Sequence, residues 1–288
     1  MGITVGAGAC QRTDVPRGEE KATGASAAAA HTVPVGDLTG SAAVGEYEIR
    51  TWRPDVGEGR VEILRDGQRI YERTGHVFEI GGSRYGPTLI EAGTDVTADG
   101  IPDAIVLEWT GGAHCCFDVE VFQLGPVFRV LARVEGQHTK PEFKDIDADG
   151  LPEVLLNDWT FAYWPGCFAD SPAPAVILHW TGARYEVARD LMCAPAPPAH
   201  ELAREAEAVR SAARWAENQG RYSQWYIPAT LFQRALDLMY SGNEDAGWAF
   251  IRQAWSPLFP VDEELLAEFR QRRNGSAYWR ALQGAEDP

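Results

Sequence analysis

The sequence has no long hydrophobic run and a shortage of basic residues. No apolar stretch reaches the roughly 18 residues that a membrane-spanning helix requires, so no transmembrane segment is expected. The chain has 26 Lys and Arg residues against 42 Asp and Glu residues, a formal net charge of −16. Proteins that bind nucleic acids or anionic lipids carry basic surfaces. We therefore expect neither kind of partner.

The sequence motifs of several common enzyme classes are also absent. The chain contains no phosphate-binding loop of the Walker type, no dinucleotide fingerprint and no zinc-finger spacing. It contains no Gly-x-Ser-x-Gly nucleophile elbow either. Apolar residues make up 45% of the chain and charged residues 24%, which is an ordinary composition for a globular protein with a buried core.

The N-terminal segment differs from the rest of the chain. Residues 1–43 are rich in Gly, Ala, Ser and Thr and show no lasting apolar period, which indicates a flexible tether. The small residues before Cys10 are typical of a bacterial lipoprotein cleavage site. Two interpretations stay open: a lipid anchor at Cys10, or an ordinary flexible terminus. The first places the protein outside the cytoplasm, in the periplasm or on the cell surface.

The remainder divides into a strand-rich and a helix-rich part. Residues 47–52 and 61–64 alternate between polar and apolar side chains, and Asp66 with Gly67 favours a tight hairpin turn. No long helical period interrupts residues 44–193, so we expect an antiparallel β domain there. Residues 199–288 change to the helical period and predict an α-helical domain with four amphipathic helices.

An acidic motif occurs twice, 50 residues apart. Residues 95–110 and 145–160 share seven of 16 positions. Residues 95–103 are called the first loop below, and residues 145–153 the second loop. Each loop has oxygen-bearing side chains at positions 1, 3, 5 and 9 and a Gly at position 6. These side chains are Asp95, Thr97, Asp99 and Asp103 in the first loop and Asp145, Asp147, Asp149 and Glu153 in the second.

This spacing suits a calcium ion. Oxygens at positions 1, 3 and 5 of a tight loop converge on one point, and Gly at position 6 allows the sharp turn. The backbone carbonyl of Ile101 or Leu151, at position 7, would complete the shell of hard oxygens that Ca²⁺ prefers. An EF-hand is excluded because its position 12 requires Glu, where this chain has Val106 and Leu156. Thr97 offers a neutral oxygen instead of a carboxylate, so the first loop is expected to bind more weakly.

Each loop closes on an acidic residue and leads through Pro102 or Pro152 into an apolar segment that we interpret as a buried strand. In these features it resembles the FG-GAP or VCBS-type repeat, the calcium loop of integrin-like β-propellers and of many bacterial secreted proteins. The resemblance implies one or two structural calcium ions. Typical propellers have 4–8 blades, whereas residues 44–193 have room for about three repeats of 50 residues. We therefore expect a mainly β fold, a partial propeller or a sandwich, followed by an α-helical domain.

Two hypotheses about function follow. The leading one is a calcium-stabilised binding or scaffold module, outside the cytoplasm, whose partner is a protein or a glycan. The alternative is an extracytoplasmic hydrolase with a site near His114, Glu108 and Asp158, because a His beside a Cys can indicate nucleophilic catalysis.

The cysteines allow more than one arrangement. Cys115, Cys116, Cys167 and Cys193 form an even set, which predicts two disulfides in an oxidising compartment. Either Cys115 and Cys116 bond to different partners, or they bond to each other and Cys167 bonds to Cys193. A thiol–disulfide sensor at Cys115 and Cys116 is a third functional hypothesis.

Overall fold

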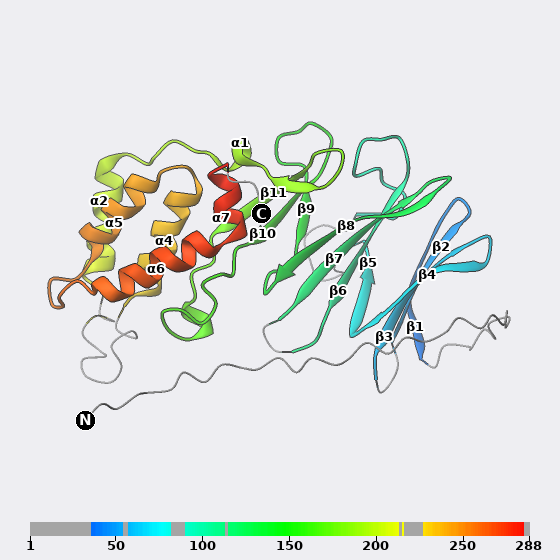
Figure 1. The fold of residues 1–288 in the computed structure, drawn as a ribbon, viewed down its shortest axis with the longest axis horizontal. Coiled ribbons are helices and arrows are strands. Elements are labelled where there is room, and N and C mark those ends of the chain that lie inside the picture. Colours follow the sequence, from blue (N-terminus) through cyan, green and yellow to red (C-terminus); the bar gives the residue numbers. More distant parts are fainter. Residues whose placement is uncertain are drawn as a thin grey trace, which may run out of the picture. The chain divides into compact units, whose positions relative to one another are not determined.

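The computed structural model describes residues 36–53, 57–81, 90–112, 115–212, 215 and 227–284. The chain divides into two units, Met1–Pro34 and Val35–Pro288, and every described residue belongs to the second. Cys10, for which the sequence leaves a lipid anchor or an ordinary terminus open, therefore lies outside the described residues. The second unit contains three antiparallel sheets of four strands, followed by helices (Figure 1).

The first sheet is a meander in which each strand pairs with the next one in the chain. Its strands are β1 (Asp37–Val44), β2 (Tyr47–Arg53), β3 (Gly59–Arg65) and β4 (Gln68–Gly75). The turn at Asp66 and Gly67 joins β3 to β4, as the sequence predicts, and both residues have positive φ angles. β1 begins inside the segment for which the sequence predicts a tether. It is an edge strand with mostly exposed side chains, so it shows no apolar alternation.

The second and third sheets repeat one arrangement. The second contains β5 (Val77–Ile80), β6 (Asp103–Trp109), β7 (Phe117–Leu124) and β8 (Phe128–Gln137). The third contains β9 (Glu142–Lys144), β10 (Glu153–Asn157), β11 (Ala175–Trp180) and β12 (Tyr185–Val187). Strand order follows chain order in both. Each Asp-rich loop therefore precedes the second strand of its own sheet, and its last residue is the first residue of that strand.

The second sheet is covered by apolar side chains on both faces, which explains the continuous apolar run in β6. Alternate residues of a strand point to opposite faces. Val106 packs with Ile49 and Ile63 of the first sheet in one core. Ile105 and Leu107 belong to a larger core that continues through the third sheet into the helices.

The α-helices follow the third sheet, whereas the short helix η1 (Phe168–Asp170) lies between β10 and β11. The α-helices are α1 (Arg189–Met192), α2 (Ala199–Arg210), α4 (Ala229–Tyr240), α5 (Glu244–Ala254), α6 (Glu263–Gly275) and α7 (Ala277–Leu282). In the part of the chain that is described, no helix is long and apolar enough to cross a bilayer. α4, α5 and α6 match three of the predicted helices, whereas α2 ends at Arg210, before the end at Asn218 that the sequence predicts, and α7 was not expected. It has only six residues, and its N-terminus is capped by Ser276, whose Oγ accepts a hydrogen bond from the Trp279 N–H.

A buried carboxylate joins the third sheet to the helices. Asp158 follows β10 and is only 2% exposed. Its Oδ2 accepts a hydrogen bond of 2.5 Å from the Tyr240 hydroxyl at the end of α4, and another from the Ser276 hydroxyl. Its Oδ1 accepts hydrogen bonds from the backbone N–H and the hydroxyl of Thr160. Burial and the charge of Asp158 raise the pKa of Tyr240, so this hydroxyl remains a donor at neutral pH.

Replacing Tyr240 by Phe should therefore lower the free energy of unfolding by about 1.5–3 kcal/mol, the usual worth of a hydrogen bond to a charged group. Urea unfolding followed by tryptophan fluorescence, in the presence of chelator, would measure the change. Tyr185→Phe is the matched control, because the Tyr185 hydroxyl is buried without a hydrogen-bond partner. Its removal should change stability by less than about 1 kcal/mol, and equal losses in the two variants would contradict the assignment.

Candidate metal-binding loops

The two Asp-rich loops have the same backbone course. At position 4 the left-handed conformation is adopted by Ala98 (φ 56°) and Ala148 (φ 63°). At position 6 it is adopted by Gly100 (φ 79°) and Gly150 (φ 94°), where a residue without Cβ is favoured. The sequence duplication is therefore also a duplication of structure.

The first loop is held by hydrogen bonds from its own backbone to its carboxylates. The Gly100 N–H donates to Asp95 Oδ2 at 2.8 Å, and the Asp99 N–H donates to Asp95 Oδ1 at 3.3 Å. The Ile101 N–H donates to Asp99 Oδ1 at 2.9 Å. These bonds turn the side chains at positions 1 and 5 toward the inside of the loop, as an ion site requires.

The second loop repeats this pattern. The Gly150 N–H donates to Asp145 Oδ2 at 3.1 Å, and the Leu151 N–H donates to Asp149 Oδ1 at 2.8 Å. Carboxylate oxygens of Asp145, Asp147 and Asp149 all lie within 4.8 Å of one another. All three residues are exposed, so an ion could reach them from solvent. Three like charges at this spacing repel, and a divalent cation between them would remove the repulsion.

The acidic residue that closes each loop is buried and ties the loop to its strand. Asp103 Oδ2 accepts a hydrogen bond from the Val96 N–H at 3.0 Å, and Glu153 Oε2 accepts one from the Ile146 N–H at 2.8 Å. Both acceptors are the first residues of their strands, and both donors are at position 2 of their loops. The closing acid thus brings the beginning and the end of the loop together.

Asp103 also carries an unpaired oxygen. The residue is 1% exposed, and its Oδ1 has no hydrogen-bond partner. Burial raises the pKa of Asp103 to about 6, and the charges of Asp95 and Asp99 act in the same direction. A buried carboxylate oxygen without a partner is costly. A cation bound beside Asp103 would supply the partner. The carboxylates of Asp95, Asp99 and Asp103 are not gathered as those of the second loop are, so the fit of calcium to the first loop depends on this oxygen and on the shared backbone course.

Two further side chains lie near the loops but belong to distant parts of the chain. Gln123 of β7 donates a hydrogen bond from Nε2 to Asp99 Oδ2. The hydroxyl of Tyr185 of β12 is buried, and burial together with the charges of Asp103 and Glu153 raises its pKa. No pattern near the loops points to either residue, because both come from other strands. Only the pairing of the strands brings them to the loops.

The residues of the hydrolase hypothesis are not brought into one site among the described residues. Glu108 is buried and forms an ion pair with Arg73, which also contacts Glu120 at 3.0 Å. Asp158 belongs to the network with Tyr240 described above. His114 lies outside the described residues. The two carboxylates therefore belong to different polar networks, and each has a structural partner.

Of the pairing Cys115–Cys116 with Cys167–Cys193, only the first disulfide is present. Cys115 and Cys116 form a disulfide with each other. Cys167 and Cys193 are exposed free thiols, so the expectation of a second disulfide is wrong for this structure. Their surroundings differ: the Cys167 Sγ lies 3.4 Å from Asp170 Oδ2, whereas Cys193 lies beside Gly242 in the helical part.

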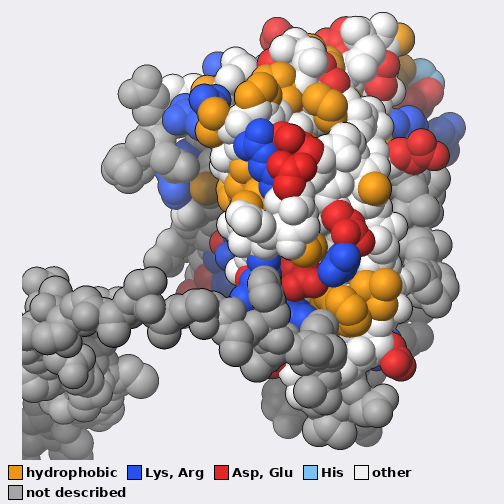
Figure 2. All heavy atoms as spheres, turned by 90° about the vertical axis from the view of Figure 1, so that its right-hand side faces the viewer, with side chains coloured by type: hydrophobic (Ala, Val, Ile, Leu, Met, Phe, Trp, Pro, Cys, Tyr) orange, Lys and Arg blue, Asp and Glu red, His pale blue; other side chains and the backbone are white. Residues whose placement is uncertain are grey.

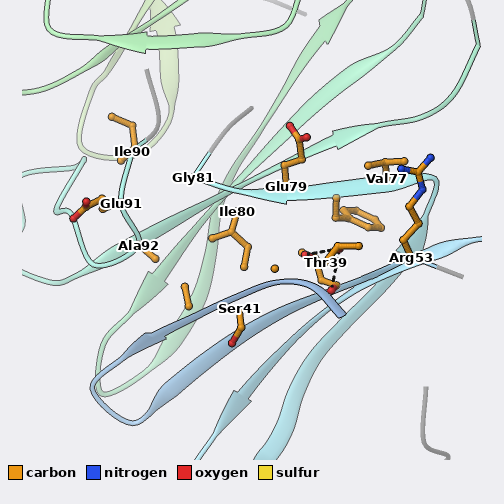
Figure 3. A pocket seen from close by; sticks show the side chains of 14 residues that line it. Thr39, Ser41, Arg53, Val77, Glu79, Ile80, Gly81, Ile90, Glu91 and Ala92 are labelled. Carbon is orange, nitrogen blue, oxygen red and sulfur yellow. Dashed lines mark hydrogen bonds between the residues drawn. The ribbon is translucent and has the colours of Figure 1, made fainter. Parts of the chain in front are cut away.

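One groove among the described residues lies between the first and second sheets. It has a volume of 530 Å³ and lies between β1 and β5, the edge strands of the first and second sheets. Figure 3 shows Thr39 and Ser41 of β1 on one side of it, and Glu79 and Ile80 of β5 on the other. None of the predicted calcium ligands lines this groove.

The charged side chains of the first sheet are largely paired. Glu48 contacts Arg50 at 2.6 Å, and Arg69 forms an ion pair with Glu72. Figure 2, which looks from the side of the first sheet, shows acidic and basic side chains next to one another. The first sheet therefore offers no counterpart to the carboxylate cluster of the second loop in the described residues.

Comparison with known proteins found no family model, curated protein or solved structure that matches the chain.

The second loop can be tested with Asp149→Asn. Asn retains the oxygen that accepts the Leu151 N–H bond but removes the charge, so the turn should persist while calcium affinity falls by tenfold or more, about 1.4 kcal/mol. Isothermal titration with calcium would measure it. Asp66→Asn, in the exposed turn between β3 and β4, is the matched control and should leave affinity unchanged. Full calcium affinity in Asp149→Asn would refute the site.

Proposed function

We propose that this protein is a calcium-binding β-repeat protein, and that its calcium ions are structural. The observation that carries the proposal is the gathering of the Asp145, Asp147 and Asp149 carboxylates in a loop whose backbone and hydrogen bonds occur twice. The unpaired Asp103 Oδ1 supports the same role for the first loop. Position 7 carbonyls, from Ile101 and Leu151, remain the expected backbone ligands.

The ions would act on the strands that follow the loops. Asp103 and Glu153 are at once expected ligands and the first residues of β6 and β10. Neutralising the repulsion within each loop would fix the start of these strands and stabilise both sheets. The three meanders in chain order also support a partial propeller, with each sheet as one blade, in line with the resemblance to FG-GAP repeats.

At the level of the whole protein, we propose a binding or scaffold module for a protein or glycan partner outside the cytoplasm. The Cys115–Cys116 disulfide supports an oxidising compartment. The groove between β1 and β5 offers a concave surface next to two strand edges. Glu108 and Asp158 both have structural partners, so no described contact favours the hydrolase hypothesis over this one.

Thermal unfolding with calcium, with magnesium and with chelator tests the proposal. A ligand at about 100 times its dissociation constant stabilises the folded state by roughly 2.7 kcal/mol per site, which corresponds to a rise in Tm of about 5–10 °C. Calcium should produce this rise. Magnesium should produce much less, because it requires a small octahedral shell and keeps its waters. An unchanged Tm in calcium would show that the loops are only turns.

A further inference from the structure

The first loop has one carboxylate fewer than the second, and a polar side chain from the neighbouring strand contacts it at Asp99. Position 3 is Thr97 in the first loop and Asp147 in the second. Thr97 is buried and donates its hydroxyl hydrogen to Asp103 Oδ2 at 3.0 Å. The side chain of Gln123 reaches the same loop from β7, where its amide contacts Asp99.

Gln123 lies between the side chains at positions 5 and 9. In the antiparallel pairing of β6 with β7, Gln123 is directly opposite Asp103, so their side chains are on the same face of the sheet. Its amide meanwhile contacts Asp99 Oδ2. An atom at this place is next to two expected ligands of a first-loop cation. Because Gln123 is only 4% exposed, water is a poor substitute for these partners.

The chemistry of an amide allows two uses of this position. In the absence of a cation, the N–H group of Gln123 faces the Asp99 carboxylate and offsets part of its negative charge. A half-turn about the Cγ–Cδ bond exchanges Nε2 and Oε1 with almost no change of shape. The amide then offers a hard, neutral oxygen of the kind that calcium accepts from Asn and Gln.

We infer that Gln123 is a calcium ligand of the first loop, and that its amide oxygen compensates for Thr97. This inference rests on the proposed function. In the third sheet, the residue opposite the closing Glu153 is His179, because Val154 pairs with Leu178 in the antiparallel register. His179 is exposed. The second loop instead has the additional carboxylate of Asp147 within its own sequence.

The unpaired oxygen of Asp103 is the second observation in support of a first-loop ion. It is buried, it belongs to the side chain opposite Gln123, and no described group donates to it. Carboxylates of Asp95, Asp99 and Asp103 supply three negative charges. A fourth carboxylate in a buried place would add repulsion, whereas an amide adds an oxygen without adding charge.

Calcium titration of the full-length chain tests the inference, with isothermal titration and equilibrium dialysis as readouts. The wild-type chain should bind two ions, and Asp95→Asn should identify the weaker as the first-loop ion. Gln123→Leu, which lacks the oxygen, should lower first-loop affinity by at least tenfold and leave second-loop affinity unchanged. Gln123→Glu keeps an oxygen at the same reach but adds a fourth carboxylate in a buried place, so it should retain calcium binding at the first loop while lowering the stability of the calcium-free protein.

The variant Gln123→Asn distinguishes loss of the amide's contact with the ion from loss of side-chain packing. It keeps a polar amide but is one methylene shorter, so it should lose first-loop affinity as Gln123→Leu does, even if the Leu variant folds poorly. Unchanged or tighter first-loop binding in both variants would overturn the inference, since Gln123 would then only compete with the ion for Asp99. A wild-type chain that binds no calcium would overturn the proposed function itself, which is a distinguishable result.

Discussion

The burial of an acidic residue at the start of a strand is the constraint on which each Asp-rich loop depends. Asp103 and Glu153 must occupy the first position of β6 and β10 inside the protein, where an isolated charge is costly. Part of that cost is offset by a backbone N–H from the beginning of the same loop. The loop is therefore closed by the residue that begins the strand, and in the second loop the carboxylates of Asp145, Asp147 and Asp149 are gathered within it. Fold and candidate site thus share their central residues.

The second sheet contributes side chains to both hydrophobic cores. Its strand β6 is apolar on both faces because one core lies toward the first sheet and another toward the third sheet and the helices. The first loop ends at Asp103, the first residue of this strand, so an ion there would act on a strand that contributes to two cores. The second loop acts on β10, which ends at Asn157, directly before Asp158 and its hydrogen bonds to α4 and Ser276. Each loop is in this way connected to long-range packing.

Much of this could be predicted from local sequence. The duplicated loops, the turn at Asp66, the strands β2 to β4 and the amphipathic helices all have patterns that short-range rules describe. β1 could not be recognised, because an exposed edge strand has no apolar face to alternate. Gln123 and Tyr185 could not be recognised either, since only strand pairing brings them to the loops. The free Cys167 and Cys193 show the same limit, because an even number of cysteines does not reveal which of them lie together.

The meander connectivity has a consequence for how the chain acquires its structure. In all three sheets, every strand pairs with its neighbour in sequence, so no sheet has to wait for residues far along the chain. Contacts of this kind close short loops and form quickly. During synthesis, which begins at the N-terminus, each sheet could form before the next one is made, in the way that successive domains fold. The exception is Asp158, whose partners Tyr240 and Ser276 are made last. The carboxylate after β10 must therefore stay solvated until the helices arrive, and their docking is the step that completes the larger core.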